Sequence, residues 1–129
     1  SVVVGDLNVG HRTLDIRNWK GNVKKSGFLP EERAYLDKIF GAEDDPDYNA
    51  GAGLGFVDVA RRFAGEVNGP YTWWSNLGKA FDNDAGWRID YQAATLELAA
   101  KVVDVKVDRA AAWDERWSDH APLVVDYQL

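Results

Sequence analysis

The sequence contains neither cysteine nor methionine. Without cysteine, disulfide bridges and thiolate metal sites are excluded, which fits a cytoplasmic protein. Protein synthesis begins with methionine, whereas this chain begins with Ser1 and a run of three valines. The start also lacks the basic residues and the long apolar core of a secretory signal. We therefore expect a fragment whose first residue lies inside a domain.

Long apolar runs and an excess of basic residues are also missing. No run approaches the roughly 18 to 20 apolar residues that a membrane-spanning helix needs, so we expect no membrane partner. The chain has 15 basic and 21 acidic residues, a net charge of −6. Bulk attraction to nucleic acid or to anionic lipid is therefore not predicted. A polyanionic partner must be held locally or through a metal ion.

The remaining composition is that of one globular domain or part of one. Of the 129 residues, 46% are hydrophobic and 28% are charged, which excludes a disordered or collagen-like chain. The charge is unevenly distributed, because residues 9–38 contain seven basic side chains and four acidic ones. A basic segment is thus present in an acidic chain.

Hydrophobic periodicity predicts an α+β fold. The apolar and alternating patterns predict strands at residues 1–6, 71–74, 87–95, 103–107 and 123–129, with the first strand buried. Pro30, Glu31 and Glu32 open a helix that we expect to end at Phe40. A second helical segment is expected at 56–63, and 41–55 has the composition of a solvated loop. The sum is a mostly antiparallel sheet with helices on one face, whose other face needs a second layer.

Five polar residues lie at or near predicted strand ends, where a site could form. They are Asp6 and Asn8 after the first strand, Asp90 within a later one, and Asp119 and His120 before the last. Carboxylate and amide oxygens suit magnesium, and a histidine can position a phosphate or a water molecule. Each residue on its own is also compatible with a turn or a capping role.

Three ordered motifs give these residues a context. The segments Gly5-Asp6-Leu7-Asn8, Gly86-Trp87-Arg88-Ile89-Asp90-Tyr91 and Ser118-Asp119-His120-Ala121-Pro122 resemble the exodeoxyribonuclease III family, which includes the abasic-site endonucleases. The resemblance implies a four-layered α-β-β-α sandwich, an α/β sandwich of which residues 1–129 would form the C-terminal half. The N-terminal half of this single nuclease domain would then be missing, and the fragment alone would lack a complete active site.

The resemblance also implies roles at the site. Asp6 would activate or orient the attacking water, Asn8 would steady that water or a phosphate oxygen, and His120 would contact the scissile phosphate. Asp90 would orient the histidine ring through a hydrogen bond, which raises the pKa of the imidazole. Asp119, Asp6 and Asn8 would bind Mg²⁺, with Mn²⁺ as an alternative.

Residues that touch DNA are implied in two regions. Arg17, Lys20, Asn22, Lys24 and Lys25 match a loop that contacts DNA phosphates, although a solvated basic loop has the same composition. Trp73, Trp87 and Ile89 match a pocket for a flipped, baseless sugar, and Leu77 matches a neighbouring wedge loop. The same tryptophans would suit core packing. Asp82 and Asp84 depart from the basic residues of relatives, and the acidic loop from Glu43 to Asp47 is longer than in relatives.

The function expected from these features is DNA repair. We expect a Mg²⁺-dependent nuclease that cleaves the phosphodiester 5′ to abasic sites and acts as a 3′-to-5′ exonuclease that cleans 3′ ends. Its partners would be double-stranded DNA and the missing half, and its location the cytoplasm, at the bacterial nucleoid. Two alternatives stay open: another phosphodiesterase of the same superfamily, acting on RNA or phosphoinositides, and a DNA-binding fragment without catalysis.

Overall fold

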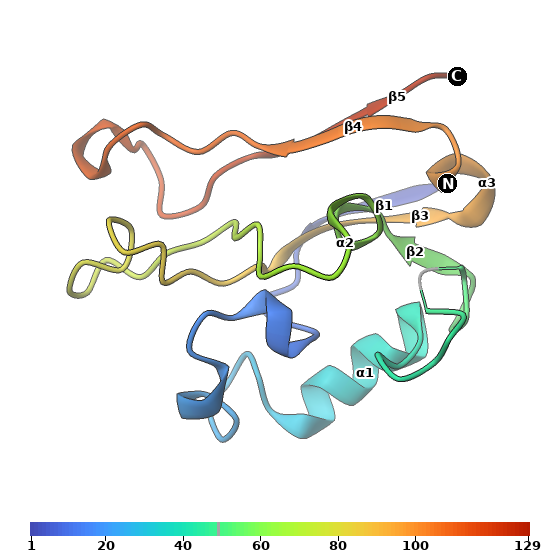
Figure 1. The fold of residues 1–129 in the computed structure, drawn as a ribbon, viewed down its shortest axis with the longest axis horizontal. Coiled ribbons are helices and arrows are strands. Elements are labelled where there is room, and N and C mark those ends of the chain that lie inside the picture. The colour runs from blue at the N-terminus through green and yellow to red at the C-terminus, as the bar shows by residue number, and fades with distance from the viewer. Residues whose placement is uncertain (49) are drawn as a thin grey trace.

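The strands form two antiparallel sheets in a computed structural model that describes residues 1–48 and 50–129. β1 (Val2–Asp6), β2 (Phe56–Asp58) and β3 (Asp90–Thr95) form a sheet in the order β1-β3-β2. β4 (Val102–Val107) and β5 (Leu123–Tyr127) form a separate hairpin. Figure 1 shows the three-stranded sheet between this hairpin and the helix α1. The mixed α/β class with antiparallel strands is confirmed, although the predicted single sheet is divided in two.

The division follows from how β3 meets β5. The two strands lie against each other, but the link between them is a side-chain hydrogen bond from Gln92 Nε2 to the Leu123 carbonyl, 3.4 Å long. The Tyr127 hydroxyl in turn donates to Gln92 Oε1 at 3.0 Å. The Gln92 side chain thus stands where a regular sheet would continue its backbone ladder.

The helix α1 (Pro30–Phe40) has the bounds that the sequence predicts. Glu32 Oε1 accepts hydrogen bonds from the backbone N–H groups of Gly27 and Leu29, at 2.7 and 3.1 Å, which satisfies donors before the helix. Leu36 and Phe40 are buried against Tyr91 of β3. The apolar face of the helix therefore fixes α1 to the sheet.

The segment 56–63, expected to be helical, contains a strand and a helix. Val57 is fully buried and pairs with Ala94, and β2 is the edge strand of the sheet opposite β1. Asp58 then caps α2 (Val59–Ala64), because its carboxylate accepts from the Arg61 backbone N–H at 3.3 Å. A short helix, α3 (Leu96–Ala99), and 3₁₀ turns at Thr13–Asp15, Trp19–Gly21 and Trp113–Glu115 complete the elements.

The strand expected at 71–74 and the start of the strand expected at 87–95 are reduced to isolated bridges. Trp73 pairs with Trp87, but β3 begins only at Asp90. The Trp87 carbonyl accepts from both the Thr72 and the Trp73 N–H, at 2.9 and 3.0 Å, and this double contact interrupts a regular ladder. The irregular backbone lies directly beside the candidate site.

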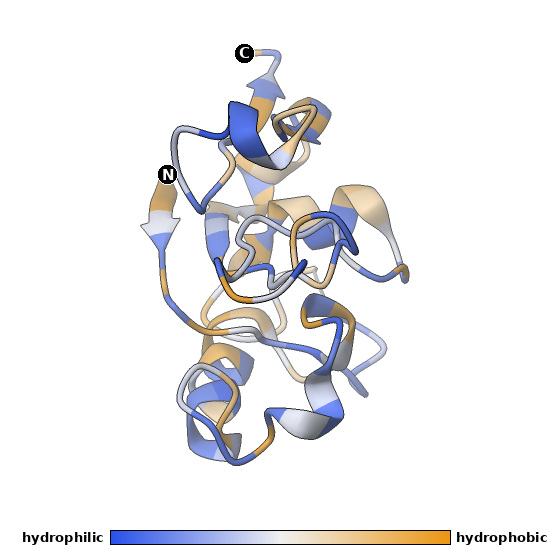
Figure 2. Ribbon diagram, turned by 90° about the vertical axis from the view of Figure 1, so that its left-hand side faces the viewer, coloured by the Kyte–Doolittle hydropathy of each residue, from blue (hydrophilic) through white to orange (hydrophobic). Residues whose placement is uncertain are grey.

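The prediction of a buried first strand is wrong. Val3 and Val4 of β1, an edge strand, are 57% and 62% exposed, so the part of the chain that the structure describes leaves these side chains largely uncovered. Figure 2 shows this apolar strand at the rim of the molecule, next to the N-terminus. An apolar groove of about 620 Å³ runs from Val3 to Tyr35 and Ile39 of α1. An open apolar face of this kind marks a surface that packs against something else.

A buried ionic network lies behind the site. Arg88 donates to Asp15 Oδ1 at 2.8 Å and to Asp58 Oδ1 at 2.9 Å, and Arg61 donates to Asp15 Oδ1 at 2.5 Å. All four side chains are at most 1% exposed. Arg88 therefore anchors the chain immediately before Ile89 and Asp90.

The acidic loop is partly fixed to the surface. The Arg12 guanidinium donates to Glu43 Oε2 at 3.2 Å, and Arg33 Nη2 lies 3.9 Å from Glu43 Oε1. Asn49, which belongs to the predicted loop 41–55, lies outside the described residues. In the part of the chain that the structure describes, no helix is both long enough and apolar enough to cross a membrane.

Candidate active site

The site begins with two aspartates on neighbouring strands. Asp6 is the last residue of β1 and Asp90 is the first of β3, and the antiparallel register places them opposite each other. Facing residues in such a pair have their Cβ atoms about 4.5–5.5 Å apart, so two carboxylates face the same space. Strand pairing thus brings together residues that are far apart in the sequence.

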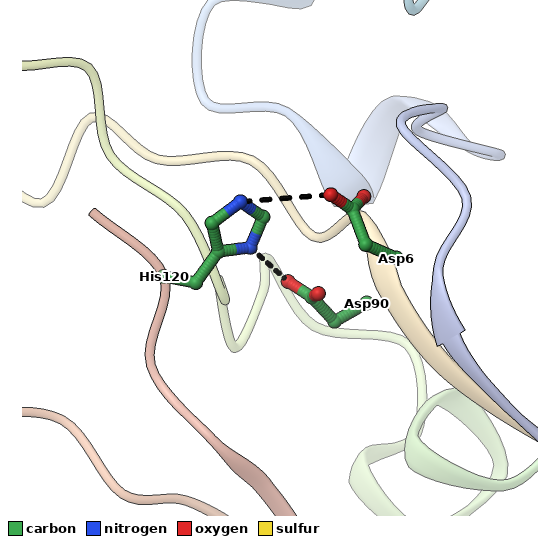
Figure 3. Close-up of side chains that lie close together, drawn as sticks. All are labelled: Asp6, Asp90 and His120. Atoms are coloured by element: carbon green, nitrogen blue, oxygen red, sulfur yellow. Dashed lines mark hydrogen bonds and ion pairs between the residues drawn. The ribbon is translucent and has the colours of Figure 1, made fainter. Parts of the chain in front are cut away.

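His120 lies between the two carboxylates. Its Nδ1 lies 2.8 Å from Asp90 Oδ2, and its Nε2 lies 3.6 Å from Asp6 Oδ2 (Figure 3). The hydrogen bond expected between Asp90 and His120 is therefore present. The backbone holds the histidine as well, because the His120 N–H donates to Ser118 Oγ at 3.1 Å and His120 forms a bridge with Trp73.

The surroundings of His120 favour its cationic form. Partial burial lowers the pKa of the imidazole, but the hydrogen bond to Asp90 and the negative charges of Asp90, Asp6 and Asp119 outweigh that effect. The pKa of His120 is therefore raised above its ordinary value. A cationic ring at this position would attract a phosphate.

A cavity of about 570 Å³ opens beside this histidine. It collects most of the residues that the sequence analysis assigned to catalysis, to the pocket and to DNA contact. Its lining residues are Asn8, Asn22, Lys25, Ser26, Gly27, Trp73, Trp87, Ile89, Asp119 and His120. One concave surface therefore combines charged, amide and aromatic groups, as ligand sites commonly do.

Two tryptophans form the apolar wall of the cavity. The rings of Trp73 and Trp87 meet edge to face, with centroids 5.9 Å apart and planes at 88°. Trp73 Nε1 donates to Asp119 Oδ2 at 3.0 Å, which ties the wall to the predicted metal ligand. Gly27 permits the close approach of Trp87, since a Cβ there would lie 2.7 Å from the indole ring.

Asn8 and Asp6 form a local turn at the end of β1. The Asn8 backbone N–H donates to Asp6 Oδ1 at 2.8 Å, and Asn8 has a φ of 56°, a left-handed conformation that asparagine tolerates. This turn orients the Asp6 carboxylate. The turn also brings Asn8 into the wall of the cavity.

Other predicted DNA contacts lie outside the cavity. Arg17, Lys20 and Lys24 are exposed side chains of the basic segment, and Leu77 is exposed on a separate loop. Asn22, which does line the cavity, donates through Nδ2 to the Asn18 carbonyl at 2.6 Å. These residues surround the site, and their contact with DNA stays a prediction.

Thr72 is a site residue that the sequence analysis did not identify. It is fully buried, and its Oγ1 accepts from the backbone N–H groups of Ile89 and Asp90, at 3.1 and 3.2 Å. Its carbonyl accepts from Ala121 N at 2.8 Å, so it also fixes the residue after His120. A threonine among aromatic residues is ordinary in a strand, and the sequence offers no signal of this role.

The donor atoms fit a divalent cation. Asp6, Asp90 and His120 each offer a ligand atom, and these atoms lie within 4.8 Å of one another. Carboxylate oxygens suit Mg²⁺ and Mn²⁺, and Asp90 already holds His120 Nδ1. Asp6 would therefore be the member of this cluster with a carboxylate left for such an ion, and the roles of Asn8 and Asp119 as ligands stay a prediction.

Known proteins are similar to this chain in sequence and fold. The chain is 33% identical over 122 residues to an exodeoxyribonuclease of Bacillus subtilis, covering 95% of the chain and 42% of that protein. An AP endonuclease from Archaeoglobus fulgidus superposes with a TM-score of 0.83 and 30% identity. The match covers 99% of this chain and 45% of the endonuclease chain. A 3′ phosphatase from Neisseria, bound to a product DNA hairpin, superposes with a TM-score of 0.80 and 26% identity. The match covers 99% of this chain and 45% of the phosphatase chain.

The chain spans less than half of the length of each of these proteins. Residues 1–120 match the model of the endonuclease/exonuclease/phosphatase family, a span that includes the first two motifs and the first three residues of the third, through His120. This match and these similarities confirm the resemblance that the motifs carry, and the chain belongs to the endonuclease/exonuclease/phosphatase family.

Proposed function

We propose that residues 1–129 form the C-terminal half of a divalent-metal-dependent DNA repair nuclease. The nuclease would hydrolyse the phosphodiester 5′ to abasic sites and remove nucleotides or blocking groups from 3′ ends. The observation that carries this proposal is the position of His120, which is bonded to Asp90 and lies 3.6 Å from Asp6 at a cavity walled by Trp73 and Trp87. Catalytic groups and an aromatic pocket thus share one surface.

Each side chain of the site would have a separate role in the hydrolysis. Asp6 accepts a proton from the water that attacks the phosphorus, and the Asn8 amide donates to that water or to a phosphate oxygen. The His120 imidazolium, held by Asp90, donates to a non-bridging phosphate oxygen and so stabilises the charge that develops in the transition state. A Mg²⁺ or Mn²⁺ ion held by Asp6, Asn8 and Asp119 would add further charge neutralisation and assist departure of the 3′ oxygen.

The cavity supports recognition of a missing base. A flipped sugar without its base can lie in the cavity against Trp73 and Trp87, whereas a normal nucleotide needs additional room for the base. Lys25 and Asn22 at the cavity rim would hold the flanking phosphates. The pocket would thus select the lesion by shape and the rim would fix the position of the backbone.

The open face of β1 supports the second part of the proposal. The exposed valines and the apolar groove of about 620 Å³ would be covered by the N-terminal half of the same nuclease domain. The isolated chain would then bind an apolar dye or associate with itself, and addition of the complementary half would suppress both. A chain that stays monomeric in light scattering and binds no dye would contradict this part.

The test of the function is incision of a labelled duplex that contains one abasic-site analogue. We expect cleavage on the 5′ side of the analogue with Mg²⁺ and none with EDTA, once the complementary half is present. A matched duplex without the lesion is the control for specificity. If the two halves together cleave RNA or a phosphoinositide but not DNA, the protein is another phosphodiesterase. If they bind DNA and cleave nothing, the chain is a binding fragment.

A further inference from the structure

A second hollow lies beside the cavity at His120, which we call the catalytic cavity, and it is formed mainly by the loop that joins β4 to β5. Its volume is about 380 Å³, and we call it the loop hollow. Two tryptophans dominate it: Trp113 is 54% exposed and Trp117 is 91% exposed. The lining residues are Asn76, Trp113, Asp114, Arg116, Trp117, Ser118 and Asp119. Exposed indole rings are costly to leave in water, which marks this loop as a binding surface.

The loop hollow adjoins the candidate active site. Asp119 lines both the loop hollow and the catalytic cavity. Ser118, which also lines the hollow, accepts the hydrogen bond from the His120 backbone N–H at 3.1 Å. A nucleotide next to the scissile phosphate would therefore meet this surface.

The loop hollow is held in shape by Arg116. The guanidinium lies over the Phe81 ring at 4.7 Å and over the Trp113 ring at 5.6 Å. Its Nη2 donates to Asn76 Oδ1 at 3.2 Å, and its Nε donates to the Trp113 carbonyl at 3.3 Å. Trp113 is thus fixed before any ligand arrives, which lowers the entropic cost of binding.

The charge of the loop disfavours phosphate as the ligand. Residues 108–119 contain four acidic and two basic side chains. Both basic side chains already have partners: Arg116 donates to Asn76 and to the Trp113 carbonyl, and Arg109 donates to Asp84 at 3.2 Å. The acidic side chains would repel a phosphate. A nucleobase, by contrast, can stack its π-face on an indole ring, and this contact needs no positive charge.

We propose that Trp117, supported by Trp113, is a stacking site for an unpaired nucleobase in the nucleotide next to the scissile phosphate. The placement relative to the phosphate rests on the proposed function, whereas the preference for a base rests on the loop hollow alone. The site favours substrates whose base is free to leave the duplex, such as a frayed or mismatched 3′ end. This stacking site is separate from the cavity lined by Trp73 and Trp87, which would accept a sugar without its base.

The experiment compares two short, labelled single strands in EDTA by fluorescence anisotropy: one of ordinary DNA, the other with a sugar-phosphate backbone that carries no bases. The chain should bind the DNA about tenfold more tightly. Trp117→Ala should remove that difference, and Trp117→Phe should retain most of it. Leu129→Ala is the matched control, because Leu129 is 90% exposed and lies at the other end of the β4–β5 hairpin (Figure 1).

Three results would overturn the stacking site. They are equal affinity for the two strands, a base-dependent difference that survives Trp117→Ala, and failure of the chain to bind the ordinary strand. The assay needs neither metal nor cleavage, so it is independent of the nuclease proposal. A chain that prefers bases but never incises DNA would retain the stacking site and lose the proposed function.

Discussion

Replacement of Asp15 by asparagine tests whether the buried ionic network holds the site in place. Asp15 Oδ1 accepts from Arg61 Nη2 at 2.5 Å and from Arg88 Nε at 2.8 Å. In Asp15→Asn, two buried guanidinium groups face one carboxylate, that of Asp58. Loss of one partner from a buried ion pair costs about 3–5 kcal/mol, because a charge is left without compensation. A domain is stable by about 5–15 kcal/mol, so the loss is a large fraction of the total.

The matched control is Glu66→Gln, the same chemical change at an exposed carboxylate. Glu66 accepts from Arg12 at 2.7 Å and its side chain is 68% exposed, whereas Arg12 is buried and keeps Glu43 as a second partner. We therefore expect a smaller loss than in Asp15→Asn, because water weakens an ion pair that has an exposed member. Urea denaturation followed by tryptophan fluorescence gives the free energy of unfolding of both variants. If Asp15→Asn loses no more stability than Glu66→Gln, the account of the network is wrong.

The same network predicts a pH dependence. Burial raises the pKa of Asp15, but the charges of Arg88 and Arg61 and the hydrogen bond from the Arg12 N–H outweigh it, so the pKa is lowered in the folded chain. The unfolded state therefore binds the proton more readily. The stability that Asp15 contributes is present above its unfolded pKa of about 3.9 and is lost as the pH falls toward the folded value. The urea midpoint should fall less steeply with acid in Asp15→Asn than in the parent, and parallel curves would refute the assignment.

Three further substitutions test the site. His120→Gln in an active preparation should lower turnover about 10²–10⁴-fold while the DNA affinity measured by anisotropy hardly changes, and unchanged turnover would remove His120 from catalysis. Lys24→Ala with Lys25→Ala should weaken DNA binding and reduce the slope of log Kd against log salt by about 2, whereas an unaltered slope would mean that neither lysine contacts phosphate. Thr72→Val should lower both stability, by about 1–3 kcal/mol in urea denaturation, and turnover, because it leaves the buried N–H groups of Ile89 and Asp90 unpaired. Thr72→Ser should restore both, and equal behaviour of the two Thr72 variants would show that the hydroxyl does not position the site.

Local signals in the sequence predicted the elements whose cause is local. The helix α1 begins at Pro30 and ends at Phe40 because proline, acidic residues and an apolar stripe occur together within that segment. The alternating valines of β4 predicted a strand within one residue of its observed start. The burial of β1 could not be predicted in the same way, because an apolar run does not tell whether the chain itself supplies a covering layer.

The residues of the site were predictable, but several of their contacts were not. The motifs singled out Asp6, Asp90 and His120, whose proximity depends on strand register and on a loop bridge. The roles of Thr72 and of the Trp87 carbonyl follow from three-dimensional contacts between segments that are distant in the sequence. The residue type alone does not show which distant backbone groups such an acceptor will bind.

The most direct test of the central claim is a crystal structure of the chain with its complementary half, bound to a duplex that carries an abasic-site analogue. We predict that the baseless sugar lies in the cavity against Trp73 and Trp87 and that His120 Nε2 contacts an oxygen of the phosphate on the 5′ side of that sugar. A duplex bound on another face, or an abasic sugar that stays stacked in the helix away from His120, would contradict the account.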